Sequence, residues 1–136
     1  MTQPDLTEGF IGLLGLQIEH ATPDEVVLGW TVDGRHHQPF GLVHGGVHCA
    51  VVETAASVGG GLWLGDRGVC VGVSNQTDFL RAGRDGRLTA RATPVHRGRL
   101  QQLWQVEITD DGGRLVARGQ VRLQNVPDGD RLGSSH

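Results

Sequence analysis

Residues 39–57 read PFGLVHGGVHCAVVETAAS, and this stretch decides how the rest of the chain is interpreted. The proline and glycine at its start predict a turn, and the apolar run after them predicts a long helix from Gly45 to about Leu64. Within that helix Glu53 is the only residue with a formal charge at neutral pH. A lone carboxylate in an uncharged helix is costly to bury without partners, so Glu53 is a candidate functional group.

Gly45 and Gly46 stand at the expected start of the helix, where free backbone N–H groups and the positive end of the helix dipole face outward. Such an end can receive a carbonyl oxygen that gains negative charge. Two turns later, Glu53 shares a helix face with Cys49 and Ser57, which lie four residues before and after it. An oxyanion donor followed by a lone carboxylate indicates acyl transfer.

The spacing of four elements, Gln38, the His-Gly-Gly turn at 44–46, Glu53 and Ser57, resembles that of hotdog-fold acyl-CoA thioesterases. Gln precedes His by six residues, Glu follows it by nine, and Ser follows Glu by four. The closest likeness is to the PaaI-like group and its hydroxybenzoyl-CoA and dihydroxynaphthoyl-CoA relatives. The resemblance covers residues 13–124 and implies an α+β hotdog fold, in which an antiparallel sheet wraps a long central helix.

Thioester hydrolysis needs a polarised carbonyl and an activated attacker. The Gly45 N–H would polarise the carbonyl, and Glu53 would act as nucleophile or as general base on water. By resemblance, Gln38 would bond the carbonyl or fix His44, and Ser57 would hold the carboxylate or the water. His44 either orients the site, donates toward the leaving thiolate, or only holds the turn. The alternatives without a catalytic role are a solvated Gln38, a Ser57 bonded to its own helix backbone, and a structural Glu53 paired with an arginine.

Coenzyme A carries phosphates, for which arginine is a preferred protein partner. Arg81 and Arg84 follow the predicted strand that bears Asn75, and Arg97 and Arg99 flank a glycine at another strand end. Relatives hold the nucleotide at these surface positions, so the resemblance implies that the five residues bind substrate. Taken singly, each arginine is better explained as a solvated charge, and only the group at two loops favours binding.

Eight residues separate Gly45 from Glu53, or about 12 Å of helix rise, so one carbonyl can hardly contact both in a single chain. We therefore expect an active site shared between two subunits. The resemblance implies the same arrangement, a homodimer that pairs into a homotetramer. The acyl group would occupy an apolar tunnel at the dimer interface, lined by the central helices and by Phe10, Leu13 and Leu14.

Composition excludes several other classes. The 136 residues carry a net charge of −3, which makes nucleic acid an unexpected partner. Polar residues and glycines within the long helix favour a buried helix over a membrane span. The two cysteines lie in apolar runs, and no secretory signal precedes them, which favours reduced thiols in the cytoplasm.

Metal and cofactor chemistry are also not expected, apart from the coenzyme A that belongs to the substrate. Four histidines lie close together in the sequence, at His36, His37, His44 and His48. The last two are four residues apart, but the acidic residue of the zinc-protease motif is missing between them.

The remaining pattern predicts one domain over residues 1–136, with a tail over 125–136. A short helix is expected over residues 5–15 and a strand over residues 26–32. After the central helix, four strands are expected over residues 69–80, 87–96, 100–109 and 115–124, with a hairpin turn at DDGG.

Two rival functions remain open. A non-catalytic acyl-CoA binding or sensing module would keep the fold, but it has no need for a costly carboxylate at Glu53. A hotdog hydratase would use a different Asp/His pairing, which the sequence lacks. No serine sits in a nucleophile elbow, which argues against a Ser-His-Asp hydrolase. Among thioesters, the resemblance favours aryl or otherwise bulky acyl groups.

Overall fold

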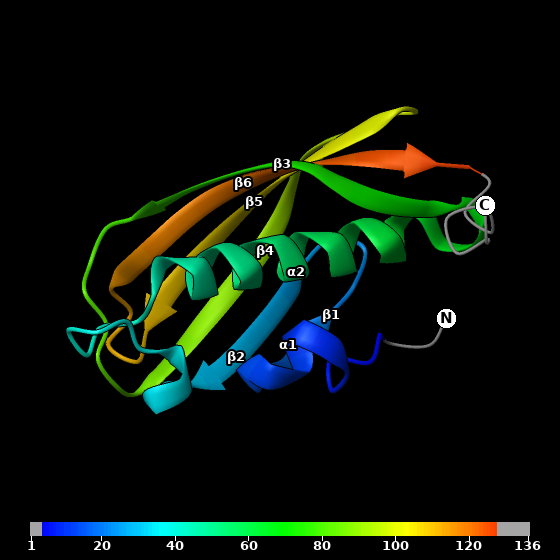
Figure 1. Ribbon diagram of the computed structural model, residues 1–136. Helices are drawn as coiled ribbons and strands as arrows, with labels where there is room; N and C mark the ends of the chain where they lie inside the picture. Colours follow the sequence, from blue (N-terminus) through cyan, green and yellow to red (C-terminus); the bar gives the residue numbers. More distant parts are fainter. Residues whose placement is uncertain (1–3, 128–136) are drawn as a thin grey trace.

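The computed structural model describes residues 4–127, in which a six-stranded antiparallel sheet curls around one long helix (Figure 1). The strands lie in the order β1-β2-β4-β5-β6-β3. The strands and helices are α1 (Gly9–Leu14), β1 (Gln17–Ala21), β2 (Val26–Thr31), η1 (Gly34–His36), α2 (Gly45–Leu64), η2 (Gly65–Arg67), β3 (Val69–Phe79), β4 (Arg87–Arg97), β5 (Gln101–Asp110) and β6 (Leu115–Val126). The α+β hotdog arrangement expected from the sequence is confirmed.

The core fills the space between α2 and the concave face of the sheet. Alternate residues of β5, from Gln102 to Ile108, are buried, as the period of a strand with one covered face requires. Trp30 of β2 and Trp104 of β5 are fully buried and supply much of the core volume. The apolar face of α2 that meets them consists of Val47, Val51, Val52, Ala55, Ala56 and Val58.

Gly59 and Gly60, two of three consecutive glycines near the end of α2, have a packing role. The helix runs to Leu64, as expected, and Gly65 follows it with a positive φ of 59°, which favours glycine. A Cβ on Gly59 would lie 2.5 Å from the indole of Trp104. The missing side chains therefore let the sheet approach the helix closely.

Several boundaries differ from the expected ones. The helix expected over residues 5–15 is confined to α1, because Gly9 has a positive φ of 65°. The last strand continues through Val126, two residues beyond the expected end, so Asn125 belongs to β6. Residues 128–136 of the expected tail lie outside the described residues.

A buried amide network explains why β6 extends that far. Gln102 donates to Asn125 Oδ1 at 2.8 Å and accepts from Trp104 Nε1 at 2.8 Å. Asn125 in turn donates to the carbonyls of Gly98 and Arg99. The β4–β5 hairpin is therefore tied to β6 by side chains that are enclosed in the fold.

The strand β3 forms one edge of the sheet, since it pairs only with β6. Val69, Val71 and Val73 alternate along it and are exposed. An apolar edge strand of eleven residues is a template for pairing with another chain unless something covers it.

The segment Gly45–Arg67, which comprises α2 and the turn after it, is long and apolar enough to cross a membrane. However, more than half of its most apolar stretch is buried within the fold, and the sheet wraps the helix (Figure 1). These features are those of a core helix.

Candidate active site

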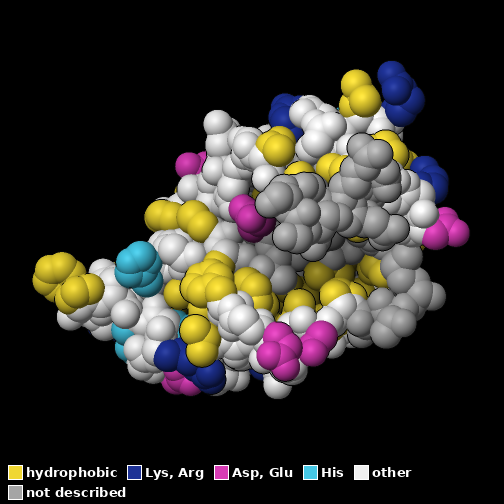
Figure 2. Space-filling view, turned by 45° about the vertical axis from the view of Figure 1, so that its right-hand side comes forward, with side chains coloured by type: hydrophobic (Ala, Val, Ile, Leu, Met, Phe, Trp, Pro, Cys, Tyr) yellow, Lys and Arg dark blue, Asp and Glu magenta, His cyan; other side chains and the backbone are white. Residues whose placement is uncertain are grey.

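A cavity of about 930 Å³ lies between the N-terminal segment, α2 and the start of β3. Hydrophobic side chains gather in a hollow on the side of the molecule where α1 and α2 come forward (Figure 2). Its lining comprises Pro4, Leu6, Phe10, Ile11, Cys49, Ala50, Glu53, Thr54, Ser57, Val58, Gly61, Leu62, Gly65, Gly68, Val69, Cys70 and Asn75. Glu53 is the only charged side chain in that lining.

The apolar wall differs in part from the expected one. Phe10 lines the cavity as predicted. Leu13 does not, because its side chain is 69% exposed on the outer face of α1, and Leu14 is buried in the core. Leu6 and Ile11 take their places at the cavity.

Glu53 faces the cavity and is exposed in the single chain, so its carboxylate is not the buried group that the sequence raised as a possibility. Asn75 Nδ2 lies 3.4 Å from Glu53 Oε1 and donates to the carbonyl of Cys49 at 3.0 Å. Thr77 Oγ1 donates to Asn75 Oδ1 at 2.7 Å, which fixes the orientation of the amide. The strand β3 thus supplies a held donor beside the carboxylate.

This contact gives Asn75 a place that the sequence did not predict. Asn75 was expected among the residues that bind coenzyme A, whereas its amide lies against Glu53. Gly72 lies next to the same carboxylate, since a Cβ there would be 3.4 Å from Glu53. Both positions are on the β3 face that meets α2, so only the strand register could have revealed them.

Ser57 lies one turn after Glu53 and lines the same cavity, as the spacing predicted. Its hydroxyl forms no hydrogen bond within residues 4–127, whereas Thr54 Oγ1 donates to Ala50 O four residues back. Both free cysteines are half-buried at the cavity wall, and burial raises the pKa of Cys70. Ser57 therefore keeps a free hydroxyl in the cavity wall, one helical turn from the carboxylate.

The start of α2 is capped in a way that leaves one amide free. His44 is the N-cap residue, and its Nδ1 accepts the N–H of Gly46 at 2.8 Å. The N–H of Gly45 has no acceptor in the part of the chain that the structure describes. His44 therefore holds the turn, one of the roles expected for it, and Gly45 presents the unpaired donor.

A second cavity, of about 330 Å³, lies at this end of the helix. Gln38, Gly45, His48, Phe79 and Arg81 contribute to its wall. Gln38 Oε1 accepts the N–H of Phe40, which leaves its amide nitrogen as the free end of the side chain. Gln38 and Gly45 are therefore brought together, as the predicted site requires.

Glu53 and Gly45 are not brought together in one chain. They line separate cavities, and the helix between them rises by about 12 Å. The free Gly45 amide and the Glu53 carboxylate of one chain thus cannot reach the same carbonyl.

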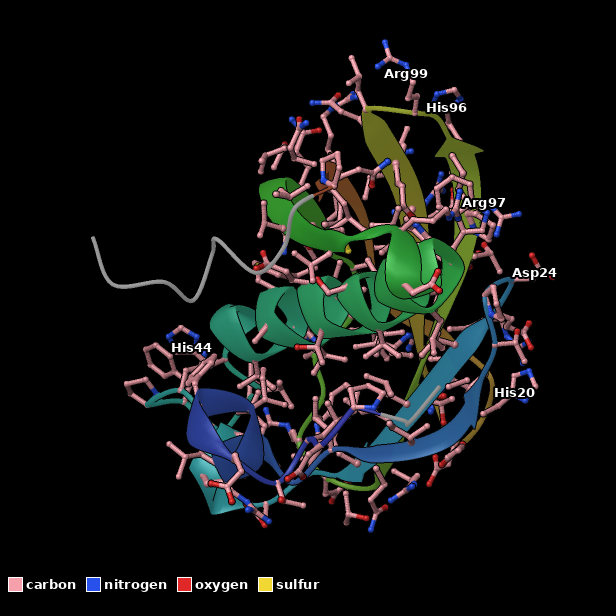
Figure 3. The ribbon with its side chains drawn as sticks, turned by 90° about the vertical axis from the view of Figure 1, so that its right-hand side faces the viewer. His20, Asp24, His44, His96, Arg97 and Arg99 are labelled. Carbon is pink, nitrogen blue, oxygen red and sulfur yellow. The ribbon has the colours of Figure 1, made fainter. Side chains whose placement is uncertain are left out.

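The two arginine pairs lie at opposite ends of α2, which is about 30 Å long. Arg81 lies at the cavity beside Gly45, whereas Arg97 and Arg99 line a third hollow beside the C-terminal end of α2. Figure 3 shows His44 at one end of the helix and Arg97 and Arg99 beyond the other. One chain thus does not gather the arginines into a single phosphate site.

Arg97 has partners that the sequence did not reveal. Its guanidinium donates to Asp24 at 3.1 Å and to the carbonyl of Pro23 at 2.9 Å (Figure 3). It also lies 5.5 Å from the ring centroid of Trp63, and Arg67 lies 4.4 Å from the same ring. Arg97 is therefore partly engaged in holding the β1–β2 turn.

The four closely spaced histidines have separate surroundings. His36 is buried, where it accepts the N–H of Asp33 and bonds the carbonyl of Leu14. His37 bonds the carbonyl of Arg84. Within residues 4–127 no three His, Cys, Asp or Glu side chains are gathered as a metal site would need.

The fold and this site define a class of protein. A long helix wrapped by an antiparallel sheet is the fold of the hotdog thioesterases. The model of the thioesterase superfamily matches residues 40–117.

Similar proteins agree with this class. The crystal structure of S. sahachiroi AziG is 56% identical in sequence, covers 88% of this chain and 98% of AziG, and has a TM-score of 0.86. The 1,4-dihydroxy-2-naphthoyl-CoA hydrolase of Escherichia coli is 37% identical over 111 residues, which are 82% of each chain. A variant of the phenylacetic acid degradation protein PaaI from Thermus thermophilus is 30% identical, covers 86% of this chain and 98% of PaaI, and has a TM-score of 0.78.

The chain belongs to the thioesterase superfamily, as an enzyme with PaaI-like relatives.

Proposed function

We propose that the chain hydrolyses acyl-CoA thioesters, with Glu53 as the catalytic carboxylate. The observation that carries the proposal is that Glu53 is the only charged side chain in the wall of a mainly apolar cavity of about 930 Å³. Such a cavity suits an apolar acyl group, and the carboxylate within it suits an attack on the thioester carbonyl. Asn75, 3.4 Å from the carboxylate, orients it.

Thioester hydrolysis needs a nucleophile that attacks the carbonyl carbon and a thiolate that leaves. Glu53 either attacks the carbonyl carbon and forms a mixed anhydride, which water then hydrolyses, or takes a proton from a water that attacks directly. In both routes the carbonyl oxygen gains negative charge, the carbon–sulfur bond breaks, and coenzyme A leaves as a thiolate that takes up a proton. The N–H of Gly45 stabilises the charged oxygen, with Gln38 as a second donor.

We further propose that each site is shared between two copies of the chain. Gly45 and Glu53 line separate cavities, so the amide must come from the copy opposite the carboxylate. The edge strand β3, with its exposed valines, is the surface through which two copies would pair. Pairing of such dimers into a tetramer is the arrangement expected from the resemblance.

The acyl group that fits best is an aryl or bulky one. The cavity wall is mainly aliphatic, with Phe10 as its aromatic member. The named activity of the Escherichia coli relative is hydrolysis of a naphthoyl-CoA, which points the same way. The phosphates of coenzyme A would be met by Arg81 and Arg84 of one copy, or by Arg97 and Arg99 of the other.

The test is hydrolysis of an acyl-CoA panel, followed by release of free thiol. The panel contains benzoyl, hydroxybenzoyl, dihydroxynaphthoyl, phenylacetyl, and short and long aliphatic thioesters. We expect aryl thioesters to be turned over, and Glu53→Gln to abolish turnover while acyl-CoA binding persists. The matched control is Glu107→Gln, on the exposed face of β5, which should leave turnover unchanged.

The outcomes separate the candidates. Unchanged turnover in Glu53→Gln would show that another group attacks the thioester. Binding of acyl-CoA by the wild-type protein without any turnover would favour the non-catalytic module. A single turnover in heavy-oxygen water distinguishes the two routes, because the mixed anhydride can leave the label in Glu53.

A further inference from the structure

His48 is a buried polar side chain that the proposed chemistry has not yet used. It is 2% exposed, and its Nδ1 is enclosed without a hydrogen-bond partner in the described part of the chain. Buried polar atoms without partners are uncommon and cost about 1–3 kcal/mol each. An enclosed imidazole whose Nδ1 lacks a hydrogen bond needs an explanation.

The ring of His48 belongs to the cavity at the start of α2. It lines this cavity of about 330 Å³ together with Gly45 and Gln38. Gly45 and His48 stand at positions i and i+3, on one face of the helix. Because helical side chains lean toward the N-terminus, the imidazole points toward the turn that carries the free amide.

Phe79 fixes the position of this ring. The two ring centroids are 5.9 Å apart, with an angle of 34° between the planes. The same phenyl ring also packs against Gly45, because a Cβ on Gly45 would lie only 2.5 Å from it. Phe79 therefore packs across both residues and forms one wall of the space in front of them.

The protonation state of His48 follows from its burial. Loss of solvent lowers the pKa of His48 to about 4, so the ring is neutral at neutral pH, with one nitrogen as donor and the other as acceptor. We assign the proton to Nε2, because an enclosed N–H without an acceptor at Nδ1 is the costlier arrangement. With Nδ1 enclosed, Nε2 is the nitrogen left for the cavity.

We propose that His48 is a catalytic residue that donates a hydrogen bond from Nε2 to the thioester carbonyl oxygen, beside the N–H of Gly45. This rests on the proposed thioester hydrolysis. The ring keeps its proton throughout and stabilises the negative charge that develops on the oxygen, as a neutral donor can. The competing explanation is that His48 only packs against Phe79.

Two substitutions separate these roles. His48→Phe keeps a planar ring against Phe79 but removes the donor, and His48→Gln keeps a donor without the ring. Loss of one donor to an oxyanion typically costs about 10²–10³ in kcat. We expect kcat to fall about 100-fold in His48→Phe with KM changed less than threefold, and His48→Gln to recover part of that loss. A His48→Phe variant with wild-type kcat would overturn the proposal.

A spectroscopic measurement tests the bond without turnover. In the Glu53→Gln background, the infrared carbonyl band of bound benzoyl-CoA, labelled with carbon-13 at the carbonyl, reports how strongly the oxygen is hydrogen-bonded. We expect the band to move to higher wavenumber when His48→Phe is added and to move less with His48→Gln. An unmoved band would overturn the role of His48, whatever the kinetics.

The two measurements keep this inference separate from the proposed function. If the wild-type protein binds benzoyl-CoA but hydrolyses no thioester, the proposed function fails, and the band still decides whether His48 bonds the carbonyl. If benzoyl-CoA does not bind, both proposals fall.

Discussion

Gln102→Leu should destabilise the protein strongly although the two side chains are of similar size. Gln102 is fully buried, and its amide accepts from Trp104 Nε1 and donates to Asn125 Oδ1, each at 2.8 Å. Leucine fills the space but leaves a buried indole N–H and a buried amide oxygen without partners. The carbonyl of Gly60 also loses a longer contact of 3.3 Å, but it keeps its place within α2.

The expected magnitude follows from the two stranded groups. Each buried group left unpaired costs about 1–3 kcal/mol, so the loss in free energy of unfolding is about 2–6 kcal/mol. A domain of this size is stable by about 5–15 kcal/mol, so the substitution would remove a large share of that stability. The β4–β5 hairpin should loosen first, since Asn125 then holds it less firmly.

The assay is equilibrium unfolding in urea, followed by tryptophan fluorescence, for the wild-type protein and for two variants. The control is Gln120→Leu, the same exchange at an exposed site of β6. We expect it to change the free energy of unfolding by less than about 0.5 kcal/mol. Equal midpoints for the Gln102→Leu and Gln120→Leu variants would refute the view that the buried amides stabilise the fold.

Three further predictions concern acid, packing and assembly. Because burial lowers the pKa of His48 from 6.5 to about 4, the unfolded chain takes up the proton first as the pH falls. Stability should therefore be level above pH 6.5 and decline by about 3 kcal/mol toward pH 4, and urea titrations should show a smaller decline in His48→Phe. Gly59→Ala would place a methyl group 2.5 Å from Trp104 and should cost about 1–3 kcal/mol, whereas Gly61→Ala, which meets no atom within 4 Å, should gain up to about 1 kcal/mol in the same titrations. Sedimentation should show that the wild-type protein is at least a dimer of the 14.6 kDa chain and that Val71→Lys shifts it toward smaller species, because a lysine would place a charge in the exposed apolar strip of β3; unchanged sedimentation of the variant would remove that strip from the interface.

Much of the fold could be predicted because its elements have clear periods. The central helix was visible as a long apolar run, and the strands as alternating segments. The end of β6 was not, because Asn125 looks like a tail residue in a hydropathy pattern. Its side chain is held by hydrogen bonds to residues 23 to 27 positions earlier in the chain, and no local sequence pattern indicates such bonds.

The site was predictable where its residues share one helix, and less so where strands meet the helix. Glu53 and Ser57 line one cavity, as their spacing implied. The contact between Asn75 and Glu53 joins residues 22 positions apart, and the pair of Arg97 with Asp24 joins residues 73 positions apart. His48 was considered only as a possible metal ligand, because its burial and its unpaired nitrogen arise from Phe79 and the surrounding fold.

The separation of Gly45 and Glu53 into two cavities has a consequence for how the enzyme behaves on dilution. With the proposed shared site, a solitary chain would carry two incomplete half-sites, so the rate per chain should fall once the protein is diluted below the dissociation constant of the proposed dimer. The shared site would also allow two inactive variants to complement each other. Mixing a Glu53→Gln chain with a chain blocked at Gly45 would form hybrid pairs in which one of the two sites has both intact halves, and activity would return from two inactive preparations.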